Sequence, residues 1–127
     1  MNKWDDEKKI RSVVNSMRAA VMIGHQKGRH VSIRASRFTG VKTIGLFWIK
    51  EKGLFHIECD FIVEEGQGKL VLVKKDTVTY LASATCHEMK LVNLERGFVR
   101  LRLVGERASL SVKATLAKSQ GIMDENI

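Results

Sequence analysis

Apolar residues recur at helical spacing near the start of the chain. They follow the i, i+3, i+4, i+7 spacing that places side chains on one stripe of an amphipathic helix. The residues of this stripe are Ile10, Val13, Val14, Met17 and Val21. Acidic residues at 5–7 and cations just after Gly24 suit the two ends of a helix dipole. The pattern therefore predicts a helix over 5–24, ended by Gly24 or Gly28.

Beyond residue 28 the apolar positions alternate with polar ones, which indicates strands. The expected strands cover 31–36, 43–50, 54–63, 70–73, 78–82, 98–104 and 108–116, whereas 86–92 fits either a strand or a short helix. Glycine-containing turns are expected at 39–40, 51–53, 66–68 and 105–106. We therefore expect an α+β fold, in which the N-terminal amphipathic helix precedes a mostly antiparallel sheet or small barrel of seven or eight short strands.

The length and composition fit a single globular domain. The 127 residues are 44% hydrophobic and 28% charged, which is typical of a protein that buries one core. We expect the helix over 5–24, a β-rich body over 29–116 and a flexible tail over 117–127. No apolar run is long enough to span a membrane and no secretory leader is seen, while two cysteines are too few for a disulfide framework. These features predict a cytoplasmic protein.

Positive charge is concentrated in the first part of the chain. The net charge is +8 and the pI about 9.8. Residues 1–50 hold eleven Lys and Arg against three acids, and no Asp or Glu occurs between Lys8 and Lys50. Such asymmetry favours a polyanionic partner, DNA or RNA, with phosphate contacts dominating affinity. The alternative is that these cations pair with acids of the second half or form a solvated face.

Two sets of residues are candidates for nucleic-acid contact. If 51–53 is a three-residue hairpin loop, Trp48 lies opposite His56 on the polar face beside Lys50, as in a platform on which bases stack. Phe47 and Ile49 would then share the core face with Phe55, Ile57 and Cys59. The alternative is that the helix or another chain covers Trp48. On a later strand, Phe98, Arg100 and Arg102 share a face, unless they pair with Glu88, Glu95 or Glu106. The predicted nucleic-acid-binding residues are Lys8, Arg11, Arg18, Lys27, Arg29, Arg34, Arg37, Lys42, Trp48, Lys50, Arg100 and Arg102, with Phe38 as a weaker stacking candidate.

No pattern supports catalysis. Spaced Cys and His pairs of a zinc site are lacking, as are nucleophile and phosphate-loop motifs. We therefore expect no catalytic residue, metal or cofactor, although a ligand pocket lined by His56, Glu58 and Asp60 would instead indicate an enzyme. The sequence predicts a small non-enzymatic nucleic-acid-binding protein. The alternative is a regulatory or adaptor protein whose basic face docks an acidic protein, and a homodimer fits both.

Overall fold

The protein is built entirely of strands in the part of the chain that the computed structural model describes, residues 16–119. The strands are β1 (Ser16–Arg18), β2 (Val21–Lys27), β3 (His30–Ile49), β4 (Gly53–Lys74), β5 (Thr77–Ala82), β6 (Cys86–Leu94) and β7 (Gly97–Lys118). Every pairing between them is antiparallel. β7 lies between β3 and β4 at the centre, β1 and β2 pair with β3, and β5 and β6 pair with β4.

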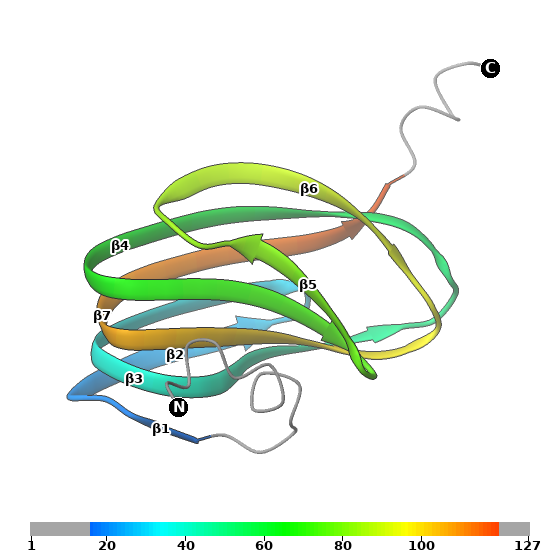
Figure 1. Cartoon of the computed structure of the whole chain (residues 1–127). Helices are drawn as coiled ribbons and strands as arrows, with labels where there is room; N and C mark the ends of the chain where they lie inside the picture. The colour runs from blue at the N-terminus through cyan, green and yellow to red at the C-terminus, as the bar shows by residue number, and fades with distance from the viewer. Residues whose placement is uncertain (1–15, 120–127) are drawn as a thin grey trace.

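The three central strands are long and bend so that each runs through two layers (Figure 1). β3 has 20 residues, and β4 and β7 have 22 each. Layer 1 contains β2, β6 and the segments 30–36, 53–63 and 108–118 of the long strands. Layer 2 contains β1, β5 and the segments 39–49, 67–74 and 97–105. All three bends lie at one end of the molecule, on the left in Figure 1.

At the bend, glycines of the three long strands lie side by side. Gly40 pairs with Gly105, which also pairs with Gly68, and the register of the ladders shifts around them. Gly66, with φ of 73°, and Gly40, with φ of 129°, adopt backbone conformations that residues with a Cβ rarely reach. Irregularities of this kind sharpen the local twist and let a strand turn from one layer into the next. The turns predicted at 39–40, 66–68 and 105–106 are therefore bends inside continuous strands.

The hydrophobic core fills the space between the two layers. Phe47 and Ile49 of layer 2 and Phe55 and Ile57 of layer 1 are all buried in one cluster. The layers touch directly at Gly45, where an added Cβ would lie 2.7 Å from the Cγ2 of Val31. The predicted core face of these strands is thus correct, because strict alternation places every second side chain inward.

The predicted helix over 5–24 is wrong where the structure describes it. Residues 16–18 and 21–27 are strands, and β2 pairs with β3 from Val21 opposite Ser36 to Lys27 opposite His30. Pairing with a neighbouring strand satisfies the backbone N–H and C=O groups of this segment, so the hydrogen bonds of a helix are not needed. Gly28, with φ of 60°, lies in a tight turn to β3 rather than at a helix end. Residues 5–15 lie outside the described residues.

A second, smaller cluster is buried on the outer face of layer 2. It consists of Val41, Val71, Val73 and Val104, with Val78 packed against it. Arg102 is fully buried beside it and donates a hydrogen bond to the Thr43 hydroxyl. Burial, together with the charge of Arg100, lowers the pKa of Arg102 to about 10. Arg102 is therefore held inside the protein and cannot meet a ligand at the surface.

The two free cysteines should differ sharply in reactivity. Cys59 is 2% exposed, and burial raises its thiol pKa to about 12, whereas Cys86 is only partly buried. Because the thiolate is the nucleophile, a pKa three units above the usual 9.0 leaves about a thousandth of the ordinary reactive fraction near neutral pH. Iodoacetamide at pH about 8 should therefore alkylate Cys86 first, as followed by peptide mass spectrometry. In denaturant both should react at similar rates, and equal rates in the native protein would contradict the described burial of Cys59.

Candidate functional site

The outer face of layer 1 carries all four histidines of the chain, together with exposed apolar side chains such as Met89 and Leu91. Ladder pairing sets side chains in rows across the strands. One row runs from His87 through Asp60, Lys113 and Ser32 to His25. The neighbouring row holds Met89, Glu58, Thr115 and His30, and the next holds Leu91 and His56. Among residues 16–119, this face therefore offers hydrogen-bonding groups and aliphatic side chains, but no aromatic ring other than imidazole.

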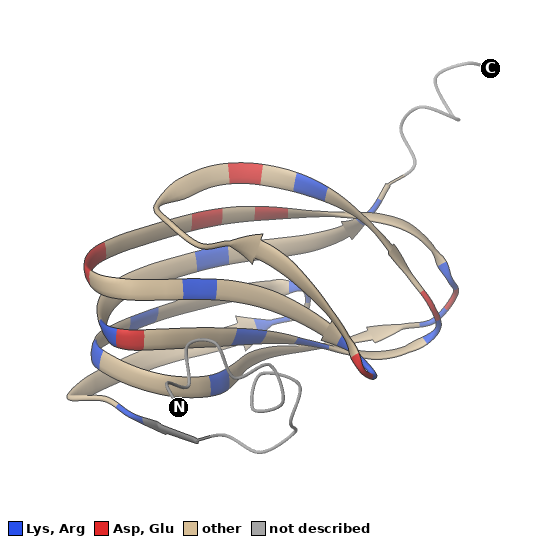
Figure 2. Ribbon diagram, viewed as in Figure 1, with Lys and Arg blue, Asp and Glu red and all other residues tan. Residues whose placement is uncertain are grey.

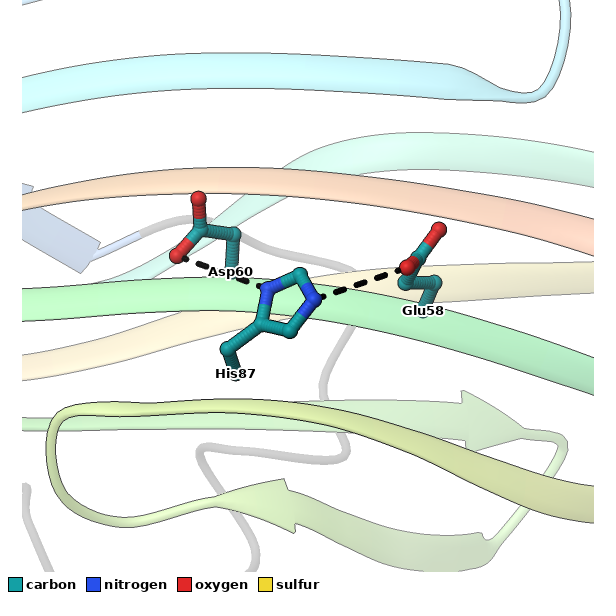
Figure 3. Close-up of polar contacts among 3 residues, drawn as sticks. All are labelled: Glu58, Asp60 and His87. Carbon is teal, nitrogen blue, oxygen red and sulfur yellow. Dashed lines mark ion pairs between the residues drawn. The ribbon is translucent and has the colours of Figure 1, made fainter.

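His87 lies between two carboxylates on this face (Figure 3). Its Nε2 is 3.6 Å from Oε2 of Glu58, and its Nδ1 is 3.9 Å from Oδ1 of Asp60. The three side chains are 45–67% exposed. Ion pairs this exposed are screened by water and contribute little to stability. The cluster is thus a solvated surface group, and nothing encloses a substrate there.

A shallow pocket lies across β2, β3 and β7 on the same face. It has a volume of about 260 Å³ and is lined by His25, His30, Ser32, Lys113 and Thr115 among others. In this pocket, the Nδ1 of His30 and the Oγ1 of Thr115 are hydrogen-bonded at 2.9 Å. Apart from Val31 and Ala114 the lining is polar, so it does not resemble the mostly apolar pockets that hold drug-sized ligands.

An exposed aromatic pair, Trp48 and Phe98, stands on the outer face of layer 2. The two residues face each other across β3 and β7, with ring centroids 4.9 Å apart and ring planes at 60°. Trp48 is 46% exposed and Phe98 is 58% exposed, and Leu46, at 49%, extends the apolar surface. Large apolar side chains left together at the surface of a folded protein mark a binding surface more often than isolated ones do. This pair is therefore the strongest candidate site in the described part of the chain.

Cations surround the aromatic pair. The Arg96 guanidinium lies 5.8 Å from the centroid of the Trp48 ring, within the range of a cation–π contact. Arg29 donates from Nη2 to the carbonyl oxygen of Trp48 at 3.4 Å and lies 5.6 Å from the centroid of the Phe55 ring. Beside Arg29 is a pocket of about 180 Å³, which we call the end pocket. Its lining is Arg29, Lys50, Glu51, Phe55 and Lys118.

The predicted hairpin register around Trp48 is wrong. β7 lies between β3 and β4, so these strands do not pair with each other. Trp48 lies opposite Phe98 in layer 2, while His56 belongs to layer 1. The exposure of Trp48 was nevertheless predicted, because alternation with Phe47 and Ile49 places it outward.

The other predicted contact residues are scattered (Figure 2). Arg29, Trp48 and Lys50 come together at one end of the molecule. Arg34 is exposed on the outer face of layer 1, and Arg37 lies at the bend. Arg100 is partly buried, Arg102 is fully buried, and Phe38 is a core residue. The remaining described cations lie in three different strands, Arg18 in β1, Lys27 in β2 and Lys42 in β3. Lys8 and Arg11 lie outside the described residues.

Three residues around Trp48 and the end pocket were not predicted from the sequence. Arg96 and Lys118 lie far from Trp48 along the chain, and Glu51 falls in a predicted turn. Only the sheet order, with β7 beside β3, brings Arg96 to the Trp48 ring. A cation two residues before an exposed aromatic, as in Arg96-Gly97-Phe98, was the one available signal.

Two further structural findings concern the described residues alone. Between residues 16 and 119, no three His, Cys, Asp or Glu side chains gather closely enough to hold a metal ion. Within the same range, no helix has the length and hydropathy that crossing a bilayer would require.

Comparison with known proteins finds loose structural likeness and no sequence match. Neither a protein-family model nor a curated protein sequence matches this chain. A family 29 carbohydrate-binding module complexed with mannohexaose has a TM-score of 0.41 and 10% identity, with 90% of this chain and 85% of that chain covered. TmCBM61 in complex with β-1,4-galactotriose has a TM-score of 0.42 and 13% identity, with 89% and 93% covered. All of these TM-scores lie below 0.5, so the likeness is loose.

The prediction of nucleic-acid binding is wrong on these findings. Three of the predicted cations, Lys8, Arg11 and Arg18, were expected on a helix over 5–24, and residues 16–18 and 21–27 of that span are strands. The predicted cations are spread over both outer faces, and Arg102 is buried. The loosely similar solved structures are described as carbohydrate-binding modules, whereas the predicted partners were DNA, RNA or an acidic protein.

Proposed function

We propose that this protein is a non-catalytic carbohydrate-binding protein that binds a saccharide on Trp48 and Phe98. The observation that carries the proposal is the exposed aromatic pair on the outer face of layer 2. A sugar ring has an apolar face of C–H groups and a rim of hydroxyls. An aromatic side chain supplies a large rigid surface for the C–H face at little cost in conformational entropy.

The backbone holds the pair ready for a ligand. Both residues lie within long paired strands, where Trp48 and Phe98 are direct cross-strand partners. Rings fixed by a sheet lose little freedom on binding, which improves affinity without adding contacts. The 60° angle between the rings presents two separate surfaces rather than one flat platform. The pair therefore suits a saccharide chain that changes direction between neighbouring units.

Polar groups for the hydroxyl rim lie next to the rings. Arg96 is positioned over Trp48, and its guanidinium carries five N–H donors in a fixed plane. The Arg29 guanidinium is held near the backbone carbonyl of Trp48. Aromatic surface bordered by a few fixed donors is the usual composition of a small-molecule site.

The absence of catalysis is part of the proposal. Hydrolysis of a glycosidic bond commonly needs two carboxyl groups flanking that bond. The carboxylates of Glu58 and Asp60, which share His87, lie on the outer face of layer 1. Trp48 and Phe98 lie on the outer face of layer 2, so a saccharide bound there is separated from these groups by the core.

Titration calorimetry with soluble oligosaccharides tests the proposal. The probes are neutral gluco-, manno- and galacto-oligosaccharides together with acidic uronate oligosaccharides. Trp48→Ala should weaken binding of the best ligand by about five- to thirtyfold, because stacking on one ring contributes on the order of 1–2 kcal/mol. Leu91→Ala removes a side chain that is 61% exposed on the outer face of layer 1 and should leave the affinity unchanged. If no oligosaccharide binds, or if both variants bind like the original protein, the proposal fails.

A further inference from the structure

We infer that the saccharide is anionic, carrying carboxylate or sulfate groups that enter the end pocket beside Trp48. This inference rests on the proposed function and narrows its ligand class. It starts from four cations that meet at the end of the molecule opposite the bend. They are Arg29, Lys50, Arg96 and Lys118, which we call the cationic collar.

The collar is continuous with the aromatic pair. Arg96 lies over the Trp48 ring, and Arg29 donates to the Trp48 carbonyl while lining the end pocket. Lys50 follows Trp48 by two residues at the end of β3, and both are exposed. A chain stacked on Trp48 can therefore reach the pocket without crossing another element.

The collar carries excess positive charge. Within residues 16–119, none of its four members forms an ion pair with a carboxylate, since the pairs present there involve His87. Glu51 is the single acidic residue in the pocket lining, against Arg29, Lys50 and Lys118. Glu95 is the sequence neighbour of Arg96 and is exposed. Cations gathered without partners repel one another, and an incoming anion relieves this repulsion.

The shape and chemistry of the end pocket suit a small anionic group. Its volume is about 180 Å³, and buried Phe55 forms an apolar part of the wall. The Arg29 guanidinium lies against the Phe55 ring, which limits its freedom and fixes its donors. A planar guanidinium binds carboxylate or sulfate oxygens through two parallel hydrogen bonds, and lysines add charge around them. A neutral sugar would leave these charges unsatisfied.

The experiment compares two double variants that remove the same charge from opposite sides of the molecule. K50Q/K118Q neutralises the two lysines of the end pocket. R34Q/K113Q neutralises two exposed cations on the outer face of layer 1. Both are titrated with a uronate oligosaccharide, a sulfated oligosaccharide and a neutral oligosaccharide of matching linkage. The two acidic probes distinguish a carboxylate from a sulfate ligand.

We expect K50Q/K118Q to weaken binding of one acidic probe at least about tenfold and of the neutral probe less than about twofold. R34Q/K113Q should bind all probes like the original protein. Raising the salt from about 0.05 M to about 0.5 M should weaken acidic binding selectively, because exposed charges are screened.

Three results would overturn the inference. If the original protein binds neutral and acidic probes equally, and Trp48→Ala weakens both, the anionic specificity fails while the proposed function stands. If the two double variants lose acidic binding equally, the effect is one of overall charge and the end pocket is not the site. If no probe binds, the proposed function fails together with this inference.

Discussion

Phe61→Ala should lower the free energy of unfolding by about 3–5 kcal/mol, as measured by urea denaturation. Phe61 is fully buried in layer 1 and belongs to the core cluster. Its ring also reaches the second segment of its own strand, where the Cζ atom would lie 3.1 Å from a Cβ added to Gly68. Truncation therefore removes contacts on both sides of the bend and leaves a cavity that the rigid ladders cannot close.

The neighbouring residue provides the matched control. Ile62 is 43% exposed on the outer face of layer 1, so Ile62→Ala should cost less than about 1 kcal/mol. Both variants remove apolar atoms from adjacent positions of one strand, and only the face differs. Equal losses from the two variants would contradict the described alternation of β4.

Gly66→Ala should destabilise the protein by about 2–5 kcal/mol for two separate reasons. The backbone φ of Gly66 is 73°, which an alanine adopts only with strain. An added Cβ would also lie 2.1 Å from the carbonyl oxygen of Arg107, a backbone atom that cannot rotate away. β4 or β7 would have to move at the bend, which would disturb the ladder between them.

Gly28→Ala separates these two causes. Gly28 has a similar φ of 60°, but nothing lies within 4 Å of its added Cβ. Its substitution should cost only the backbone strain, about 1 kcal/mol. The difference between the two variants in thermal or chemical unfolding measures the steric clash at the bend. If Gly66→Ala were as mild as Gly28→Ala, β4 and β7 would be farther apart than described.

The sequence predicted which residues are apolar and inward far better than how the strands are connected. Segments 31–36 and 43–50 were expected as separate strands, and both belong to β3. The glycine at 39–40 allows the backbone conformations of a hairpin turn and of a bend within a strand alike, so the local sequence does not distinguish the two. Choosing between them requires the neighbouring strands, whose glycines lie beside Gly40.

The same ambiguity explains the wrong helix. The predicted helix was ended by Gly24 or Gly28, and the positive φ of Gly28 suits a helix end and a hairpin turn alike. Within this span Val21 is 50% exposed and Ile23 is 68% exposed, whereas Met22 between them packs against the core. Pairing with β3 decided the structure of this segment, which is a case of tertiary contacts overriding local pattern.

The candidate site was predictable in part. Alternation alone placed Trp48 outward, and Phe98 was recognised as sharing a face with cations. Their contact depends on β7 lying beside β3, which no local pattern indicates. For the same reason the sequence placed Trp48 beside His56, a residue of the other layer.

The bent strands also determine how the molecule must assemble. The β3–β7 ladder joins residues far apart in the chain, such as Val31 with Ala114 and Ile49 with Gly97, and a search for such distant partners makes folding slow. Because the β3–β7 and β4–β7 ladders both continue through the bend, neither layer contains a complete set of strands of its own that could form first. The chain contains no proline, so refolding lacks the slow isomerisation that often divides a population into fast and slow molecules. Refolding should therefore follow a single exponential, with both layers gaining their structure in the same step.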